Sequence, residues 1–150
     1  MRVQIIDIDH NGRGIAKDNN KVIFIPKTIP GDEVEIDIVS LKKNYDEGRV
    51  KNIISRSKDR VDSKCPYYGI CGGCNISNLV YEKQLLYKKN KVINIFKRFL
   101  NMNINPGIIP SNKEYSYRNK ITLHNDDKLG LVSLDNRIID IDKCLLVSEK

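Results

Sequence analysis

The arrangement of the cysteines constrains this chain more than any other sequence feature. Cys65, Cys71 and Cys74 lie within ten residues in the pattern C-x5-C-x2-C, and Cys144 follows seventy residues later. Glycines in and around this pattern allow the backbone turns that bring neighbouring thiolates onto one centre. In a cytosolic protein, cysteines spaced this closely indicate a metal centre more often than disulfides. We therefore expect a site that ties residues 65–74 to the region of Cys144.

The spacing favours an iron–sulfur cluster and leaves zinc open. Iron–sulfur clusters often take several cysteines from one loop and another from elsewhere, whereas structural zinc sites use two close pairs. The sequence has one close pair, an outlying Cys65 and a remote Cys144. We predict that Cys65, Cys71, Cys74 and Cys144 bind a [4Fe–4S] cluster, with zinc on the same thiolates as the alternative. Because four ligands leave no open coordination position, the centre should have a structural role.

The first 55 residues show the pattern of a small β-barrel. Apolar, β-branched segments suited to strands are residues 3–8, 22–25, 34–38 and 49–54. Pro30 and Gly31 occupy the central positions of an expected type II turn. Short strands separated by turns favour an OB-like, five-stranded barrel, an architecture that often binds nucleic acid.

The remaining residues predict one helix and further strands, so the fold class is α+β. Residues 56–64 are polar, without periodicity, and are interpreted as a linker. Residues 79–100 place apolar side chains on one helical stripe and lysines on the opposite face. Expected strands are residues 115–124, 129–134 and 137–141, with Asp135 and Asn136 as a hairpin turn.

The charge distribution indicates a polyanionic partner. The net charge is +7, yet residues 1–55 are neutral and residues 56–120 carry thirteen basic against four acidic side chains. A basic region on an otherwise balanced chain is typical of nucleic-acid binding, although a solvated lysine-rich face gives the same pattern. No apolar run approaches the roughly 20 residues of a membrane span, and no signal peptide is recognisable. We expect a cytoplasmic monomer that does not bind membranes.

Several segments together resemble the N-terminal part of bacterial RNA (uracil-5-)-methyltransferases, in the iron–sulfur branch of the family that makes 5-methyluridine. Each segment matches in the order expected for that family. The segments are residues 12–16, 22–25, 30–32 and 42–45 for a TRAM domain, residues 65–74 and 81–84 for the cluster loop and its helix, and residues 117–120, 129–131 and 141–144 for the central domain.

The resemblance implies a division into a TRAM domain at residues 1–58 and an incomplete central domain at residues 59–150. It also implies methyl transfer from S-adenosylmethionine to uracil C5 in RNA, with 23S rRNA expected and tRNA possible. In the family, the cysteine nucleophile and glutamate base lie in a C-terminal Rossmann-like domain. This sequence has no glycine-rich strand-to-helix turn followed by an acidic residue. We therefore expect an N-terminal fragment without catalytic or cofactor-binding residues, inactive by itself.

The resemblance also suggests RNA contacts. Tyr67 and Tyr68 are expected either to shield the cluster from solvent or to pack in the core. Basic and aromatic side chains bind RNA through phosphates and stacked bases. The candidates are Arg13, Lys42, Lys43 and Tyr45 on barrel loops, Lys88 and Lys89 on the helix, and Arg118 and Lys120 farther along. Two alternatives stay open: a free-standing RNA-binding module with a cluster, and a zinc-stabilised interaction protein.

Overall fold

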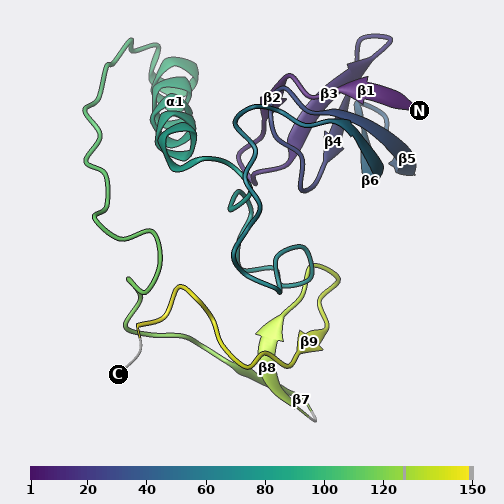
Figure 1. The fold of residues 1–150 in the computed structure, drawn as a ribbon. Coiled ribbons are helices and arrows are strands. Elements are labelled where there is room, and N and C mark those ends of the chain that lie inside the picture. The colour runs from purple at the N-terminus through teal and green to yellow at the C-terminus, as the bar shows by residue number, and fades with distance from the viewer. Residues whose placement is uncertain (127, 149–150) are drawn as a thin grey trace. The chain divides into compact units, whose positions relative to one another are not determined.

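A computed structural model describes residues 1–126 and 128–148 and divides into two compact units. Unit 1 consists of residues 1–62 and 75–108, and unit 2 consists of residues 63–74 together with residues from 109 onward. The colours of Figure 1 show this exchange, because a teal loop leaves the first unit and returns to it. The cysteine loop thus belongs with the C-terminal segment, and each unit is considered separately below.

Unit 1 contains a curled, barrel-like sheet. Its strands are β1 (Arg2–Gln4), β2 (Asp7–Ile8), β3 (Gly14–Asp18), β4 (Lys21–Ile25), β5 (Glu33–Leu41) and β6 (Tyr45–Ser55). Their order in the sheet is β1-β5-β6-β4-β3-β2, and every pair is antiparallel except β4 with β6. β1 and β2 stand at opposite ends of this order although only Ile5 and Ile6 separate them in the chain. The sheet must therefore curl on itself.

The strand count differs from the five predicted. The predicted segments 22–25, 34–38 and 49–54 lie within β4, β5 and β6. Residues 3–8 form two short strands because the chain changes partners between Ile5 and Ile6: the Ile5 amide still donates to the Asp32 carbonyl beside β5, whereas the Ile6 amide donates to the Ile15 carbonyl of β3. β3 was not predicted, since Gly14, Lys17 and Asp18 obscure its alternation. The sheet has six strands as a result, and its barrel-like character remains.

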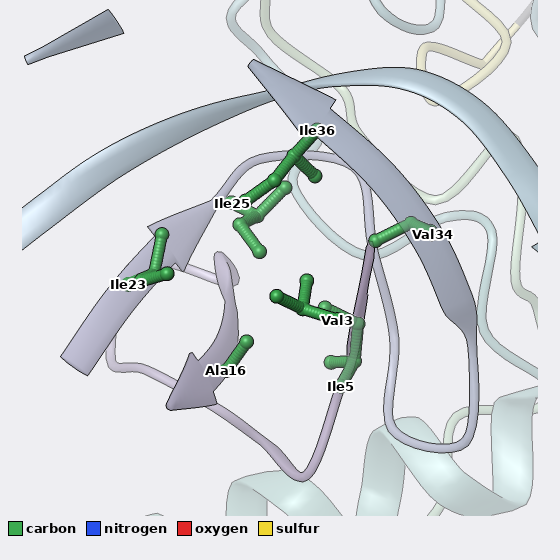
Figure 2. Close-up of a cluster of buried hydrophobic side chains, with 7 residues drawn as sticks. All are labelled: Val3, Ile5, Ala16, Ile23, Ile25, Val34 and Ile36. Carbon is green, nitrogen blue, oxygen red and sulfur yellow. The ribbon is translucent and has the colours of Figure 1, made fainter. Parts of the chain in front are cut away.

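The core of this sheet consists of inward-facing aliphatic side chains. Figure 2 shows Val3, Ile5, Ala16, Ile23, Ile25, Val34 and Ile36 converging from β1, β3, β4, β5 and the bend after β1. None of the seven is more than 7% exposed. A second cluster of Ile8, Ile29 and Leu79 packs with Tyr87 and Ile76. It connects the barrel to the segment that precedes the helix.

The predicted type II turn at residues 29–32 is present. Gly31 has φ +89°, which the third position of this turn requires, and the Asp32 amide donates to the Ile29 carbonyl at 3.1 Å. A Cβ at Gly31 would also lie 2.9 Å from the Ser57 hydroxyl oxygen. The turn therefore needs glycine for its backbone conformation and for the close approach of residue 57.

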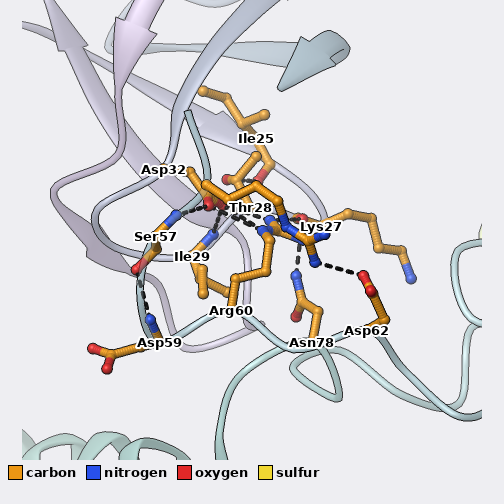
Figure 3. A network of polar contacts seen from close by, with 11 residues as sticks. Ile25, Lys27, Thr28, Ile29, Asp32, Ser57, Asp59, Arg60, Asp62 and Asn78 are labelled. Atoms are coloured by element: carbon orange, nitrogen blue, oxygen red, sulfur yellow. Dashed lines mark hydrogen bonds and ion pairs between the residues drawn. The ribbon is translucent and has the colours of Figure 1, made fainter. Parts of the chain in front are cut away.

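The linker prediction for residues 56–64 is wrong over its central part, where a buried ion pair holds the chain against the barrel (Figure 3). The Asp32 carboxylate is fully buried and accepts from the Ser57 amide at 3.0 Å and the Arg60 guanidinium at 2.9 Å. Arg60 and the Asn78 side chain both donate to the Lys27 carbonyl. A buried carboxylate must be paired, and that requirement orders a segment that looks flexible in the sequence.

The predicted helix is α1 (Tyr81–Leu100), and it belongs to unit 1. It ends at Asn101, whose left-handed backbone lets its amide donate to the Phe96 carbonyl. The Tyr87 hydroxyl donates to the Asp9 carbonyl, and Lys91 Nζ donates to the His10 carbonyl at 2.9 Å. None of its side chains is fully buried, so much of the apolar stripe is exposed. The exposed apolar residues are Leu86, Val92, Ile95, Phe99 and Leu100.

Unit 2 has a small antiparallel sheet of β7 (His124–Asp126), β8 (Lys128–Val132) and β9 (Ile138–Ile139), in the order β7-β8-β9. The predicted strand at 115–124 is wrong. Instead, the Arg118 amide donates to the Leu146 carbonyl, and the Ser148 amide donates to the Arg118 carbonyl. These bonds form only an isolated parallel bridge between Arg118 and Val147, and of the predicted range only His124 lies in a strand, β7. Among the described residues, no helix has the length and apolar character needed to cross a membrane.

Candidate cysteine site and RNA-binding surface

The cysteine loop is a series of tight turns anchored to unit 2. The Tyr67 carbonyl accepts from the Cys71 amide at 2.8 Å, and the Gly73 amide donates to Cys71 Sγ at 3.3 Å. The Gly72 amide donates to the Val132 carbonyl at 3.0 Å, so Cys71 pairs with Ser133 in an isolated β-bridge. The loop is therefore fixed by backbone bonds to the end of β8.

All four cysteines belong to unit 2. Burial raises the pKa of the Cys74 thiol, and the neighbouring Cys71, Cys144 and Cys65 raise it further, while Arg118 opposes them. The Cys74 thiol is therefore within electrostatic range of the other three thiols. Four thiols are a donor set suited to a [4Fe–4S] cluster or to zinc. Within the described ranges, however, no three metal-binding side chains are already arranged around one point, so the assignment of these ligands stays a prediction.

Tyr115 is an aromatic residue near the cysteine loop that the sequence did not indicate. Burial raises the pKa of Tyr115, and the Cys74 and Cys65 thiols add to the effect of nearby Glu114. Tyr67, which was expected either to shield the cluster or to pack in the core, donates its hydroxyl to the Asp142 carboxylate at 3.0 Å and accepts from the Asp142 amide. Its hydroxyl therefore links the loop to the residues before Cys144.

The predicted RNA contacts on the barrel do not share one environment. The Arg13 guanidinium forms an ion pair with Asp9 at 2.7 Å and lies over the Phe24 ring, with Cζ 4.3 Å from its centroid. Lys42 and Lys43 are exposed in the turn between β5 and β6. Tyr45 begins β6 and packs edge-on against Phe24. Phe24 was missed, although its alternation with buried Ile23 and Ile25 places it on the outer face.

The other predicted contacts are distributed over both units. Lys88 and Lys89 lie on α1, with Lys88 exposed and Lys89 half-buried. Neither lines the groove of about 410 Å³ between α1 and the barrel, where Lys83, Lys91 and Arg98 are found instead. Arg118 and Lys120 are exposed residues of unit 2. The eight candidates therefore do not form one continuous cluster within either unit.

Comparison with known sequences points to one family. Residues 1–51 match the TRAM domain. An uncharacterised RNA methyltransferase of Halalkalibacterium halodurans is 35% identical over 159 aligned residues, which cover the whole of this chain and 34% of that protein. The 23S rRNA (uracil(1939)-C(5))-methyltransferase RlmD of Legionella pneumophila is 35% identical over 121 residues, covering 80% of this chain and 27% of that protein.

A solved structure agrees with these sequence matches. The tRNA (uracil-54, C5)-methyltransferase of Pyrococcus abyssi, crystallised with S-adenosyl-L-homocysteine, superimposes with a TM-score of 0.68 at 28% identity. The match covers 99% of this chain and 33% of that one. The chain thus spans about a third of the length of the relatives it matches. With its TRAM domain, it corresponds to the N-terminal part of the RNA (uracil-5-)-methyltransferase family, as its sequence motifs predicted.

Proposed function

We propose that these 150 residues are the RNA-binding and cluster-holding part of an S-adenosylmethionine-dependent RNA (uracil-5-)-methyltransferase that acts on 23S rRNA in the cytoplasm as a monomer. The observation that carries this proposal is the superposition of 99% of the chain on a uracil methyltransferase crystallised with S-adenosyl-L-homocysteine. That ligand is what S-adenosylmethionine becomes after it gives up its methyl group. We assign no catalytic or cofactor-binding role to any of the 150 residues.

Residues 1–58 are proposed as the RNA-binding domain and residues 59–150 as the start of the central domain. The TRAM match over residues 1–51 supports the first assignment, as do the exposed Lys42 and Lys43 on the barrel. The anchored cysteine loop supports the second. RNA binding by the barrel would depend mainly on phosphate contacts and stacking, because such contacts tolerate many sequences.

Cys65, Cys71, Cys74 and Cys144 are proposed to hold a [4Fe–4S] cluster, which when bound would crosslink the loop to the C-terminal part of unit 2. The electrostatic effect of Cys71, Cys144 and Cys65 on the Cys74 thiol and the position of all four in unit 2 support this role. So does the amide donated by Gly73 to Cys71 Sγ, since hydrogen bonds to sulfur stabilise the negative charge of cluster ligands. Metal binding would also overcome the raised pKa of the Cys74 thiol, because a metal-bound thiol is deprotonated.

The substrate can be identified from the RNA that loses its modification. We expect deletion of the gene that encodes this chain to remove one 5-methyluridine from 23S rRNA, measured by mass spectrometry of nuclease fragments. Restoring the intact gene should return the modification and provides the control. Loss from tRNA alone would contradict the ribosomal assignment and identify tRNA as the substrate. Unchanged 5-methyluridine in both RNAs would contradict the methyltransferase proposal.

A further inference from the structure

An aromatic pair lies on the outer face of the barrel. In β4, Ile23 and Ile25 are 1% and 0% exposed, whereas the intervening Phe24 is partly exposed. Strand alternation places Val22 and Phe24 on the same outer face, and their register partners in β6 are Tyr45 and Glu47. The outer surface over β4 and β6 therefore carries two neighbouring aromatic rings.

These rings form an ordered assembly with Arg13. The Phe24 and Tyr45 centroids are 5.4 Å apart with the ring planes at 68°, a stable edge-to-face arrangement. The Arg13 guanidinium lies over the Phe24 ring and is held by Asp9 at 2.7 Å and Glu47 at 3.5 Å. Because two carboxylates already neutralise this guanidinium, it is poorly placed to bind a phosphate. The Arg13 side chain nevertheless remains 28% exposed.

Lysines border the same surface. Lys17 is exposed on β3 and pairs with Val22, which in turn pairs with Tyr45. Lys42 and Lys43 are exposed in the adjoining turn, where the Lys42 amide donates to the Tyr45 carbonyl at 3.0 Å. None of the ion pairs found in the described part of the chain involves these three lysines. Their charges are thus available to a polyanion.

We propose that Phe24, Tyr45 and Arg13 form a stacking platform for unpaired bases of the RNA. Bases stack on aromatic rings and on arginine guanidinium planes, so Tyr45 and Arg13 would receive bases while Phe24 holds both in place. Lys17, Lys42 and Lys43 would bind the flanking phosphates. This proposal rests on the proposed RNA-binding function. It replaces the predicted phosphate contact of Arg13 with a stacking role, and it adds Phe24 as a positioning residue.

The first test uses affinity and its salt dependence. The full 150-residue chain would be titrated with a fluorescent single-stranded oligouridine and with a duplex of equal length. We expect Phe24→Leu to weaken single-strand binding about 5- to 150-fold, the range for loss of roughly one stacked base, with little change in the salt slope. Phe99→Leu is the matched control, since Phe99 is an aromatic residue with 72% exposure outside the platform, and it should bind like the unmodified chain.

The second test observes stacking directly. The chain contains no tryptophan, so Tyr45→Trp and Phe99→Trp each introduce a single tryptophan, whose emission can be excited selectively. We expect the single strand to quench the emission of the first variant and leave the second unchanged. A 5-iodouridine oligomer should also photo-crosslink to Tyr45 in the unmodified chain, a result that does not depend on any variant folding.

The outcomes separate the platform from RNA binding in general. RNA binding without quenching, without a crosslink and without loss in Phe24→Leu would overturn the platform and leave the proposed function standing. A failure of the unmodified chain to bind either RNA would overturn both. Quenching, a crosslink at Tyr45 and selective loss in Phe24→Leu would establish the platform.

Discussion

At the residue scale, Asp32 decides how the chain continues after the barrel. Burial alone would raise the pKa of this carboxyl, but hydrogen bonds from Arg60, Ser57 and Ile29 outweigh burial and hold the pKa below its usual value. The folded state therefore stabilises the ionised form of the Asp32 carboxyl. Its partners lie in the turn before β5 and in the segment after β6, so one side chain connects two separate parts of unit 1.

Replacing this carboxylate should destabilise unit 1 strongly. We expect Asp32→Asn to lower the free energy of unfolding by about 3–5 kcal/mol, because Arg60 would keep a buried charge without its partner. Asp135→Asn is the matched control, since Asp135 pairs with Arg137 on the exposed surface of unit 2 and exposed pairs contribute little. Urea denaturation of both variants measures the difference. Equal effects would contradict the role assigned to the buried pair.

The pH dependence gives a further check on the same residue. The folded pKa of Asp32 lies below the ordinary value of 3.8, so its stabilising effect is present above that pH and is lost as the pH falls through the folded pKa. We expect the stability difference between the unmodified chain and Asp32→Asn to be constant near neutral pH and to shrink below pH 3.8. A difference that stays the same throughout the acid range would contradict the assigned ionisation.

Cys71 is the most informative single thiol, because its amide, its sulfur and its β-bridge are all engaged. We expect Cys71→Ser, purified without oxygen, to lose most of the bound iron and to unfold unit 2 at lower urea concentration. Ile70→Ala changes an exposed neighbour in the same loop without removing a thiol, and it should retain the iron. Full iron content in Cys71→Ser would show that the ligand assignment is wrong.

At the element scale, the hairpin of β8 and β9 requires glycine at position 130. A Cβ there would lie 2.0 Å from the Ile139 carbonyl oxygen, whereas a Cβ at Gly107 would meet nothing within 4 Å. We expect Gly130→Ala to destabilise unit 2 by about 1–3 kcal/mol, as overpacking does, and Gly107→Ala to leave it nearly unchanged. Hydrogen exchange of the β8 amides would measure the effect, and equal protection in both variants would contradict it.

The turn between β5 and β6 should contribute electrostatically to RNA binding. We expect Lys42→Ala with Lys43→Ala to lower the slope of log affinity against log salt by about 1.4 for single-stranded RNA, or about 0.7 per phosphate contact. Lys51→Ala with Lys58→Ala removes the same charge from elsewhere in unit 1 and is the control. A similar change in slope for both pairs would indicate a general charge effect rather than contacts at this turn.

Elements with strong periodic or turn signals could be predicted from the sequence. The alternation at residues 34–38, the turn at Pro30 and Gly31, and the helix were all correct, because local physics determines them. β3 and the ordered segment around Arg60 were missed, since β3 depends on pairing with β4 and Arg60 depends on a buried carboxylate far away in the sequence. The expected strand at 115–124 was wrong except at His124, because its pairing with residues 145–148 is limited to one isolated bridge at Arg118.

The two candidate sites also differ in how far the sequence predicts them. The cysteine spacing by itself predicts a common site, and all four cysteines belong to unit 2, but their role as ligands of one centre stays a prediction. The aromatic platform could not be predicted as a unit, because Arg13, Phe24 and Tyr45 come from different parts of the barrel. Arg13 and Tyr45 were predicted only as separate RNA contacts, and Phe24 was missed although it is an aromatic residue at an outward position of a buried strand.

At the scale of the whole molecule, the two compact units hold different parts of the proposed function. Unit 1 carries the barrel with its platform, and unit 2 carries all four cysteines. The chain passes from unit 1 to unit 2 and back before entering unit 2 again. A cluster that crosslinks residues 65–74 to Cys144 would therefore hold together a unit built from two separate segments, which its small sheet alone supports weakly.

Iron and sulfide analysis of the anaerobically purified chain, with its visible absorption spectrum, tests the central claim most directly. We expect about four irons and four sulfides per chain and a broad absorption band near ~400 nm, as a [4Fe–4S] cluster requires. Such a result would establish that these residues hold the cluster and would support their place in the iron–sulfur branch of the methyltransferase family. A colourless, folded protein that binds one zinc would contradict the cluster assignment and favour a zinc-stabilised module.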